Sequence, residues 1–142
     1  GNNKNKHKFF NMILCHTNKL YLNNLQQYKL TIKQRNSLLQ SQPNLNDVQI
    51  WNEKLSDLGE KIWKTRKDFF SNFTSIFTNL WNQLDCKFKA NIEYHNNQIL
   101  SKNEYYEQLC SNHLNDLKAG YTKKGPHKDI IDLFFNNMPI KE

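Results

Sequence analysis

Acidic residues are missing from the first third of the sequence. All thirteen Asp and Glu residues lie at or beyond Asp47. Seven cations precede it: Lys4, Lys6, Lys8, Lys19, Lys29, Lys33 and Arg35. The remaining stretch balances thirteen cations against thirteen acids, so the formal net charge of +7 belongs to the first third. A one-sided cationic element suits a polyanion, and we expect these seven side chains to contact the phosphates of a nucleic acid. A solvated helix face enriched in lysine by codon bias is the alternative interpretation.

Cysteine is scarce, and no long apolar run is present. The three cysteines, Cys15, Cys86 and Cys110, are an odd number without close pairing. This argues against a disulfide framework and favours a reducing compartment. No apolar run approaches the ~20 residues of a membrane span, and no apolar segment follows the N-terminal residues as it does in a secretory signal. The sequence therefore predicts a cytoplasmic protein without membrane association.

The residue patterns of common catalytic and metal sites are also missing. Cys110 and His113 share a helical spacing, but two ligands do not make a metal site. No nucleophile elbow and no paired-carboxylate motif specifies a reaction. There are only four glycines, and none forms the Gly-x-x-x-x-Gly-Lys-Ser/Thr phosphate loop. We therefore expect no catalytic residue, no metal and no cofactor in this chain.

Hydrophobic spacing predicts a mainly α fold built on a long antiparallel helical hairpin. From about residue 6 to residue 39 the sequence reads as one helix, with seam residues at steps of four and three: Tyr21, Leu25, Tyr28, Ile32, Arg35 and Leu39. Pro43 ends it, and Asn46 can cap a second helix. The second helix has apolar residues at intervals of seven: Val48, Leu55, Ile62, Phe69 and Ile76. Gly59 within it indicates close packing. We expect residues 1–84 to form this coiled-coil-like arm.

Residues 85–142 are expected to form a smaller α+β portion. Alternation from Phe88 to Tyr94 is typical of a half-buried strand. Ser101 and Glu104 have the spacing of a capping box. The helix that follows should end near Gly120 and bury four residues: Tyr105, Leu109, Leu114 and Leu117. A C-terminal hairpin is predicted from residues 132–135 and 138–141, with a turn at residues 136–137.

Four stretches, spread in order over nearly the whole chain, share a pattern with one known family. Residues 6–11 read Lys-His-Lys-Phe-Phe-Asn, and residues 21–39 run from Tyr-Leu to Lys-Gln-Arg-Asn-Ser-Leu-Leu. Residues 50–59 read Ile-Trp-Asn-Glu-Lys-Leu-Ser-Asp-Leu-Gly, and residues 120–129 read Gly-Tyr-Thr-Lys-Lys-Gly-Pro-His-Lys-Asp. Together they resemble the RecF family, the bacterial ATP-dependent recombinational repair proteins related to ABC/SMC-like ATPases.

The resemblance implies that the chain is the arm, or lid, region of a longer protein. In that family the phosphate loop, signature motif and Mg-binding strand lie outside this region, in an ATPase head. ATP and Mg²⁺ are then cofactors of the full-length protein, a weak ATPase that forms homodimers. The resemblance also implies binding of single-stranded or gapped DNA and recombination-mediator proteins as partners. The chain begins with Gly rather than Met, as expected for a segment.

A tight turn carries the most family-like residues: Gly125, Pro126, His127, Lys128 and Asp129. By the resemblance it leads from the arm into the ATPase head, where His127 and Asp129 could couple nucleotide state to arm position. The alternative is a structural turn in which these two side chains bond to backbone groups. Lys128 replaces the usual Arg of the family and gives up its bidentate fork.

A second class of function fits the same features. A helical hairpin rich in lysine could recruit an acidic protein and have no direct contact with DNA. Because phosphate contacts release condensed counterions, a steep dependence of DNA affinity on salt separates DNA binding from this alternative.

Overall fold

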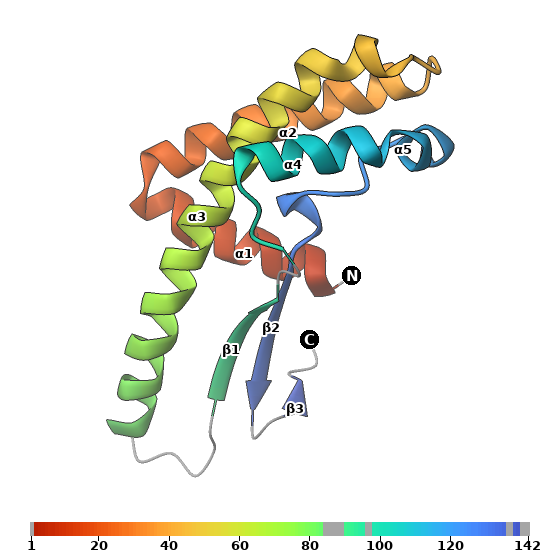
Figure 1. Cartoon of the computed structure of the whole chain (residues 1–142). Coiled ribbons are helices and arrows are strands. Elements are labelled where there is room, and N and C mark those ends of the chain that lie inside the picture. The colour runs from red at the N-terminus through yellow and green to blue at the C-terminus, as the bar shows by residue number, and fades with distance from the viewer. Residues whose placement is uncertain (1, 84–89, 96–97, 136–137, 140–142) are drawn as a thin grey trace.

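The two helices with heptad spacing pack against each other in the computed structural model, which describes residues 2–83, 90–95, 98–135 and 138–139 (Figure 1). They are α2 (Lys19–Leu39) and α3 (Leu45–Gln83). A short connection, in which Gln42 has a φ of 56°, reverses the chain between them. The buried seam contains Tyr28 of α2 and Leu55 of α3, as the spacing predicted. The mainly α fold is therefore confirmed.

The predicted single helix over residues 6–39 is wrong. The structure has two helices there, because α1 (Asn2–Thr17) ends before α2 begins. Asn18 between them is extended, with a φ of −141°, and its side chain accepts a hydrogen bond from the Tyr21 backbone N–H at 3.0 Å. Asn at this position is a strong N-cap, so local capping overrides the continuous hydrophobic pattern. The chain turns at Asn18, and α1 runs back beneath α2 toward β2 (Figure 1).

The third predicted helix is confirmed at both ends and interrupted in the middle. Ser101 and Glu104 form the capping box that starts α4 (Lys102–Ser111), and Gly120, with a φ of 77°, ends α5 (His113–Ala119). The break at Asn112 changes the helical phase. Leu114, predicted to face inward, is consequently 71% exposed, and His113 is buried instead.

A small antiparallel sheet lies beside the lower half of α3 (Figure 1). Its strand order is β1 (Ala90–His95), β2 (Ile130–Phe135) and β3 (Met138–Pro139). Tyr94 pairs with Ile131 in the register of β1 and β2. The predicted C-terminal hairpin is confirmed as the pairing of β2 with β3. Its turn at residues 136–137, the strand start at Phe88, and residues 140–141 lie outside the described residues.

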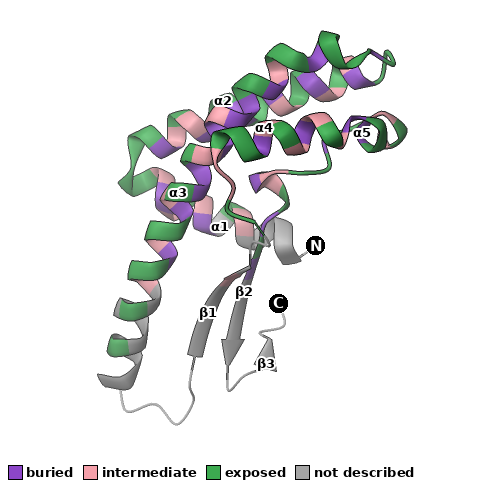
Figure 2. Cartoon of the chain, in the orientation of Figure 1, coloured by how far each residue is buried: buried purple, intermediate pink, exposed green. Residues whose placement is uncertain are grey.

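The core is shared by segments from both ends of the chain, where α2, α3 and α4 face one another (Figure 2). One cluster joins Leu14 of α1 to Leu58 of α3 and Leu109 of α4. A second joins Phe10 of α1 and Ile131 of β2 with Phe70 of α3. Both clusters cross residue 84, and the division into units 1–84 and 85–142 stays a prediction.

Gly59 is a point of close packing between α3 and α4, as predicted. A Cβ atom at this position would lie 2.6 Å from Cε2 of the Tyr105 ring. Tyr105 is fully buried, so its ring has little room to retreat. Glycine is therefore required by sterics at this point of α3, although its φ is helical.

We predict that Gly59→Ala lowers the free energy of unfolding by about 1–3 kcal/mol, the usual cost of overpacking a core. The loss should outweigh the ~1 kcal/mol by which Ala favours a helix. Urea unfolding followed by circular dichroism measures it. Asn72→Ala, at an exposed position of the same helix, should be neutral or slightly stabilising. A Gly59→Ala protein at least as stable as the parent chain would contradict this packing.

Candidate functional site

Four of the seven predicted DNA-contacting cations are exposed lysines. Lys8 lies on α1, and Lys19, Lys29 and Lys33 lie on α2. Among the described residues no carboxylate forms an ion pair with any of the four. Lys29 and Lys33 are four residues apart and so share one face of α2. The side chains of Lys4 and Lys6, also on α1, lie outside the described part of the structure.

The prediction that Arg35 contacts DNA is wrong, because its side chain is fully buried. Its Nη1 atom lies 2.9 Å from Oδ2 of Asp116, in an ion pair inaccessible to solvent. Nε donates to Oδ1 of Asn52 at 2.8 Å, and Nη1 donates to Oγ1 of Thr122 at 2.9 Å. Arg35 occupies the seam that its spacing predicted, and there it ties α2 to α3 and α5.

The turn at residues 125–129 folds against α2, α3 and α4. Gly125 has a φ of 146° and precedes the 3-10 turn η1 (Pro126–Lys128). A Cβ on Gly125 would collide with the hydroxyl groups of both Tyr28 and Tyr105. Glycine is therefore needed here for its backbone conformation and for the close approach of the two tyrosines.

His127 is held between a tyrosine and a backbone carbonyl. Its Nε2 lies 2.9 Å from the Thr122 carbonyl, and its Nδ1 lies 2.7 Å from the Tyr28 hydroxyl. Because the carbonyl can only accept, Nε2 carries the proton and Nδ1 accepts from Tyr28. Burial is the main cause that lowers the pKa of His127 to about 4, and the charges of Lys128 and Arg66 add to it. The imidazole is therefore neutral at physiological pH.

Asp129 forms the centre of a second buried network. Arg66 of α3 lies 2.9 Å from its Oδ2, and the Trp63 indole N–H points at both carboxylate oxygens, at 3.1 and 3.0 Å. The Tyr94 hydroxyl donates to it as well. Burial raises the pKa of Asp129, while Arg66, Tyr94 and Trp63 oppose that shift. With three donors aimed at it, we assign the carboxylate as ionised.

Besides Asp129, Arg66 reaches three other segments of the chain from this position. Nη1 donates to the Pro126 carbonyl at 2.6 Å, Nε to the Tyr21 hydroxyl at 3.1 Å, and Nη2 to Oδ1 of Asn11 at 3.4 Å. Burial opposes the charge of Arg66, but Tyr21, Tyr94 and Asp129 outweigh it, so its pKa is raised. The guanidinium is thus a permanent cation beneath the surface.

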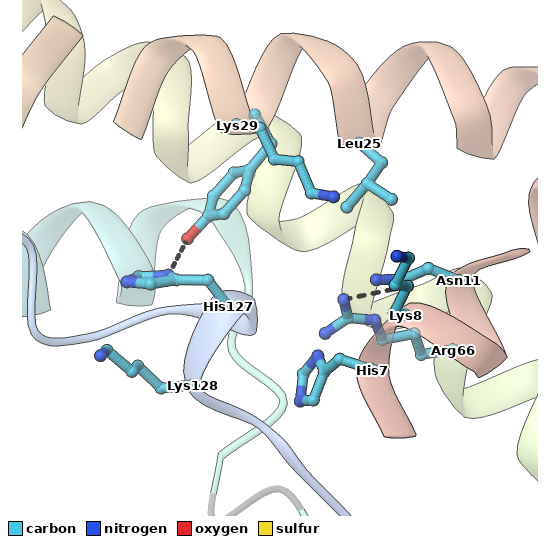
Figure 3. Close-up of a pocket in the computed structure, with 9 residues that line it drawn as sticks. His7, Lys8, Asn11, Leu25, Lys29, Arg66, His127 and Lys128 are labelled. Carbon is cyan, nitrogen blue, oxygen red and sulfur yellow. Dashed lines mark hydrogen bonds between the residues drawn. The ribbon is translucent and has the colours of Figure 1, made fainter. Parts of the chain in front are cut away.

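A hollow of about 370 Å³ opens above Arg66, where α1, α2, α3 and η1 meet (Figure 3). The described residues that line it are rich in basic side chains and include no carboxylate: His7, Lys8, Asn11, Leu25, Tyr28, Lys29, Arg66, His127 and Lys128. The structure thus brings Lys8 and Lys29 from the predicted cationic set together with His127 and Lys128 from the predicted turn. We call this feature the basic hollow.

Arg66, the residue that joins these parts, was not among the site residues predicted from the sequence. One signal could have found it. Only two of the twenty basic residues are arginines, and both Arg35 and Arg66 turn out to be buried and ion-paired. An arginine in such a lysine-rich chain marks a place where a planar fork of donors is needed.

The described residues contain no group of three or more side chains suited to hold a metal ion. None of the described helices combines the length and the hydrophobicity that a membrane-spanning segment needs.

In fold, the chain matches part of a recombination mediator protein. That protein is RecF: the solved structure of RecF with ATP in the RecFOR pathway has a TM-score of 0.83, at 22% identity over 96% of this chain and 40% of that one. The RecF–ATPγS structure has a TM-score of 0.79, at 24% identity over 95% of this chain and 39% of that one.

Curated proteins give the same match in sequence. "DNA replication and repair protein RecF" of Acetivibrio thermocellus is 30% identical over 149 residues, and that of Chlamydia abortus is 28% identical over 141 residues. These matches cover 96% and 94% of this chain but only 40% and 38% of the relatives. No family model matches the chain. The resemblance to RecF is therefore confirmed over nearly the whole chain, which spans about two fifths of the length of those relatives.

We predict that Asp129→Asn lowers the free energy of unfolding by about 3–5 kcal/mol, because it leaves the buried Arg66 charge uncompensated. Chemical unfolding at neutral pH measures the loss. Asp68→Asn, an exposed position on α3, should change stability by no more than about 0.5 kcal/mol. Equal effects from the two substitutions would show that the Arg66–Asp129 pair is not structural.

We also predict an acid-sensitive stability that depends on His127. Below pH 6.5 the unfolded chain protonates this imidazole, whereas the folded chain resists until about pH 4. The unfolded state then binds more protons, so stability is full above pH 6.5 and falls by roughly 3 kcal/mol toward pH 4. His127→Gln should flatten this slope in unfolding curves recorded across the window. His16→Gln, at an exposed position, should leave it unchanged, and an unaltered slope in His127→Gln would refute the assignment.

Proposed function

We propose that this chain is the DNA-contacting helical arm of a RecF-like protein of DNA replication and repair. The whole protein, in this proposal, binds single-stranded or gapped DNA in an ATP-dependent manner, as a homodimer working with recombination-mediator proteins. The chain itself performs no catalysis. What supports the DNA contact most directly is the set of four exposed lysines, Lys8, Lys19, Lys29 and Lys33, none of which has a carboxylate partner among the described residues.

The predicted cations do not lie along one continuous helix. Because the chain turns at Asn18, Lys8 on α1 is brought back toward Lys29 on α2, and the two line the same hollow. The contact surface is therefore a corner between two helices. Contacts from such a corner go to phosphates and carry no base readout, since lysine acts as a point charge.

In this proposal, stacking of DNA bases on aromatic side chains of the basic hollow contributes little to binding. Tyr28, the aromatic residue that lines the basic hollow, is 1% exposed, and its hydroxyl is engaged by His127. Single-strand binders that stack bases need accessible rings. The expected binding is accordingly electrostatic and independent of sequence.

ATP and Mg²⁺ do not fit a complete site within this chain. The sequence has no phosphate loop, and the described residues lack a carboxylate cluster suited to a metal. In the proposal these cofactors bind a head that this chain does not supply. The turn at residues 125–129 would pass the nucleotide state of that head to the arm, because Asp129 and Arg66 connect it rigidly to α3.

We predict that the affinity of the chain for single-stranded DNA falls steeply with salt. Four phosphate contacts give a slope of about −3 in a plot of log K against log salt, at ~0.7 per contact. Reversing Lys19, Lys29 and Lys33 to Glu should abolish binding in fluorescence anisotropy while the helical circular dichroism spectrum is kept.

A charge-matched control is available on α3. Lys54, Lys64 and Lys67 are exposed there, and their reversal to Glu changes the net charge by the same amount. This variant should retain most of the DNA affinity. If both triple variants lose binding equally, the contact is non-specific. If neither does, the protein-interaction alternative takes over.

A further inference from the structure

The basic hollow concentrates positive charge that the fold does not use. Lys8, Lys29 and Lys128 are exposed at its rim, and no described carboxylate forms an ion pair with any of them. The Nζ atom of Lys128 lies over the Tyr121 ring, 5.2 Å from its centre. Asp129, the nearest buried acid described above, is turned to Arg66, Trp63 and Tyr94 beneath the hollow. Within the described part of the chain, the rim charges therefore have no carboxylate partner.

The cations approach the hollow from different elements of the fold. In Figure 3 the Lys29 side chain extends from α2 across the opening toward Arg66 and the residues of α1. Lys128 lies on the η1 side, opposite His7, with its ammonium directed away from Arg66. Because three helices and a turn supply the lining, its shape depends on tertiary structure and not on the composition of one helix.

The floor of the hollow holds a fixed donor. Arg66 has five N–H groups, of which the bonds to Tyr21, Pro126, Asp129 and Asn11 take four. One Nη2 proton is left on a guanidinium whose position is set by those four bonds. Because this donor is already held in place, a ligand that binds it does not have to pay the conformational entropy of ordering the side chain.

Burial, together with the positive charge around the hollow, lowers the pKa values of two histidines that line it, His7 and His127. Burial is the largest cause that lowers the pKa of His7, the hydrogen bond to the Asp129 carbonyl opposes it, and the charges of Arg66 and Lys29 lower it further. For His127 the lowering charges are Lys128 and Arg66. Burial, with the charges of Arg66, Lys29 and Lys128 adding to it, thus disfavours protonation of either imidazole.

We propose that the basic hollow binds a phosphoryl group, with Lys8, Lys29 and Lys128 around it and Arg66 beneath it. Several point charges that surround one guanidinium match a multiply charged tetrahedral oxyanion better than a single carboxylate. The volume of about 370 Å³ lies at the small end of ligand sites. The group comes either from the DNA backbone, in which case the inference rests on the proposed function and gives the arm a fixed anchoring point, or from a free phosphate or nucleotide.

The test uses calorimetric titration of the 142-residue chain with inorganic phosphate and, separately, with a short oligothymidylate, at constant ionic strength. Lys8→Gln, Lys29→Gln and Lys128→Gln should each weaken phosphate binding about tenfold, the effect of one charge-assisted hydrogen bond. Lys64→Gln and Lys67→Gln, exposed on α3 and outside the lining, should not. Circular dichroism checks that each variant is folded.

The outcomes of the two titrations distinguish the two sources of the phosphoryl group, and they distinguish this inference from the proposed function. If phosphate competes with oligothymidylate and the hollow variants weaken both, the DNA backbone is the source. If the variants weaken phosphate alone, the source is a free phosphate or nucleotide. Phosphate binding without any DNA binding would support the hollow and contradict the proposed function. No phosphate binding by the parent chain, or equal losses in the α3 controls, would overturn the inference even if DNA still bound.

Discussion

The buried ion pair between Arg66 and Asp129 is the interaction on which the rest of the structure depends. It joins the middle of α3 to the residue between η1 and β2, and the bonds of Arg66 to Asn11 and Tyr21 bring in α1 and α2. Removing two charges from water costs several kcal/mol, so the net stabilisation by the pair is small. Its role is to fix one arrangement, because any shift of these elements leaves a buried charge without its partner.

A second buried pair acts at the other end of the hairpin. Arg35 and Asp116 are 81 residues apart in sequence and 2.9 Å apart in space. With both arginines engaged inside, the positive surface is made by lysines. This division follows the chemistry of the two side chains, since a planar fork satisfies several buried acceptors at once, whereas an ammonium on a flexible stem suits an exposed phosphate contact. Of the cations that the sequence concentrates in its first third, only lysines therefore contribute to the described positive surface.

How much could be read from the sequence depends on the range of the interactions concerned. The seam of α2 and α3 around Tyr28 and Leu55, the tight packing at Gly59 and the end at Gly120 follow from local spacing and backbone chemistry, and these were predicted correctly. Periodicity placed Arg35 in the seam, but it could not show that Asp116 forms an ion pair with it there. The break at Asn18 was missed because one capping side chain competes with an apolar pattern that continues on either side. The basic hollow could not be predicted at all, since His7, Lys29, Arg66 and Lys128 meet only in three dimensions.

The central claim is that the corner between α1 and α2, with the turn at residues 125–129, is where this chain meets DNA. Amide chemical shifts followed by NMR during an oligothymidylate titration test it most directly. The account predicts that the largest shifts cluster at Lys8, Lys29 and Lys128, while α5, at the far end of the hairpin, stays unchanged (Figure 1). Shifts centred on the exposed apolar positions Ile50 and Leu114, with the corner silent, would contradict it.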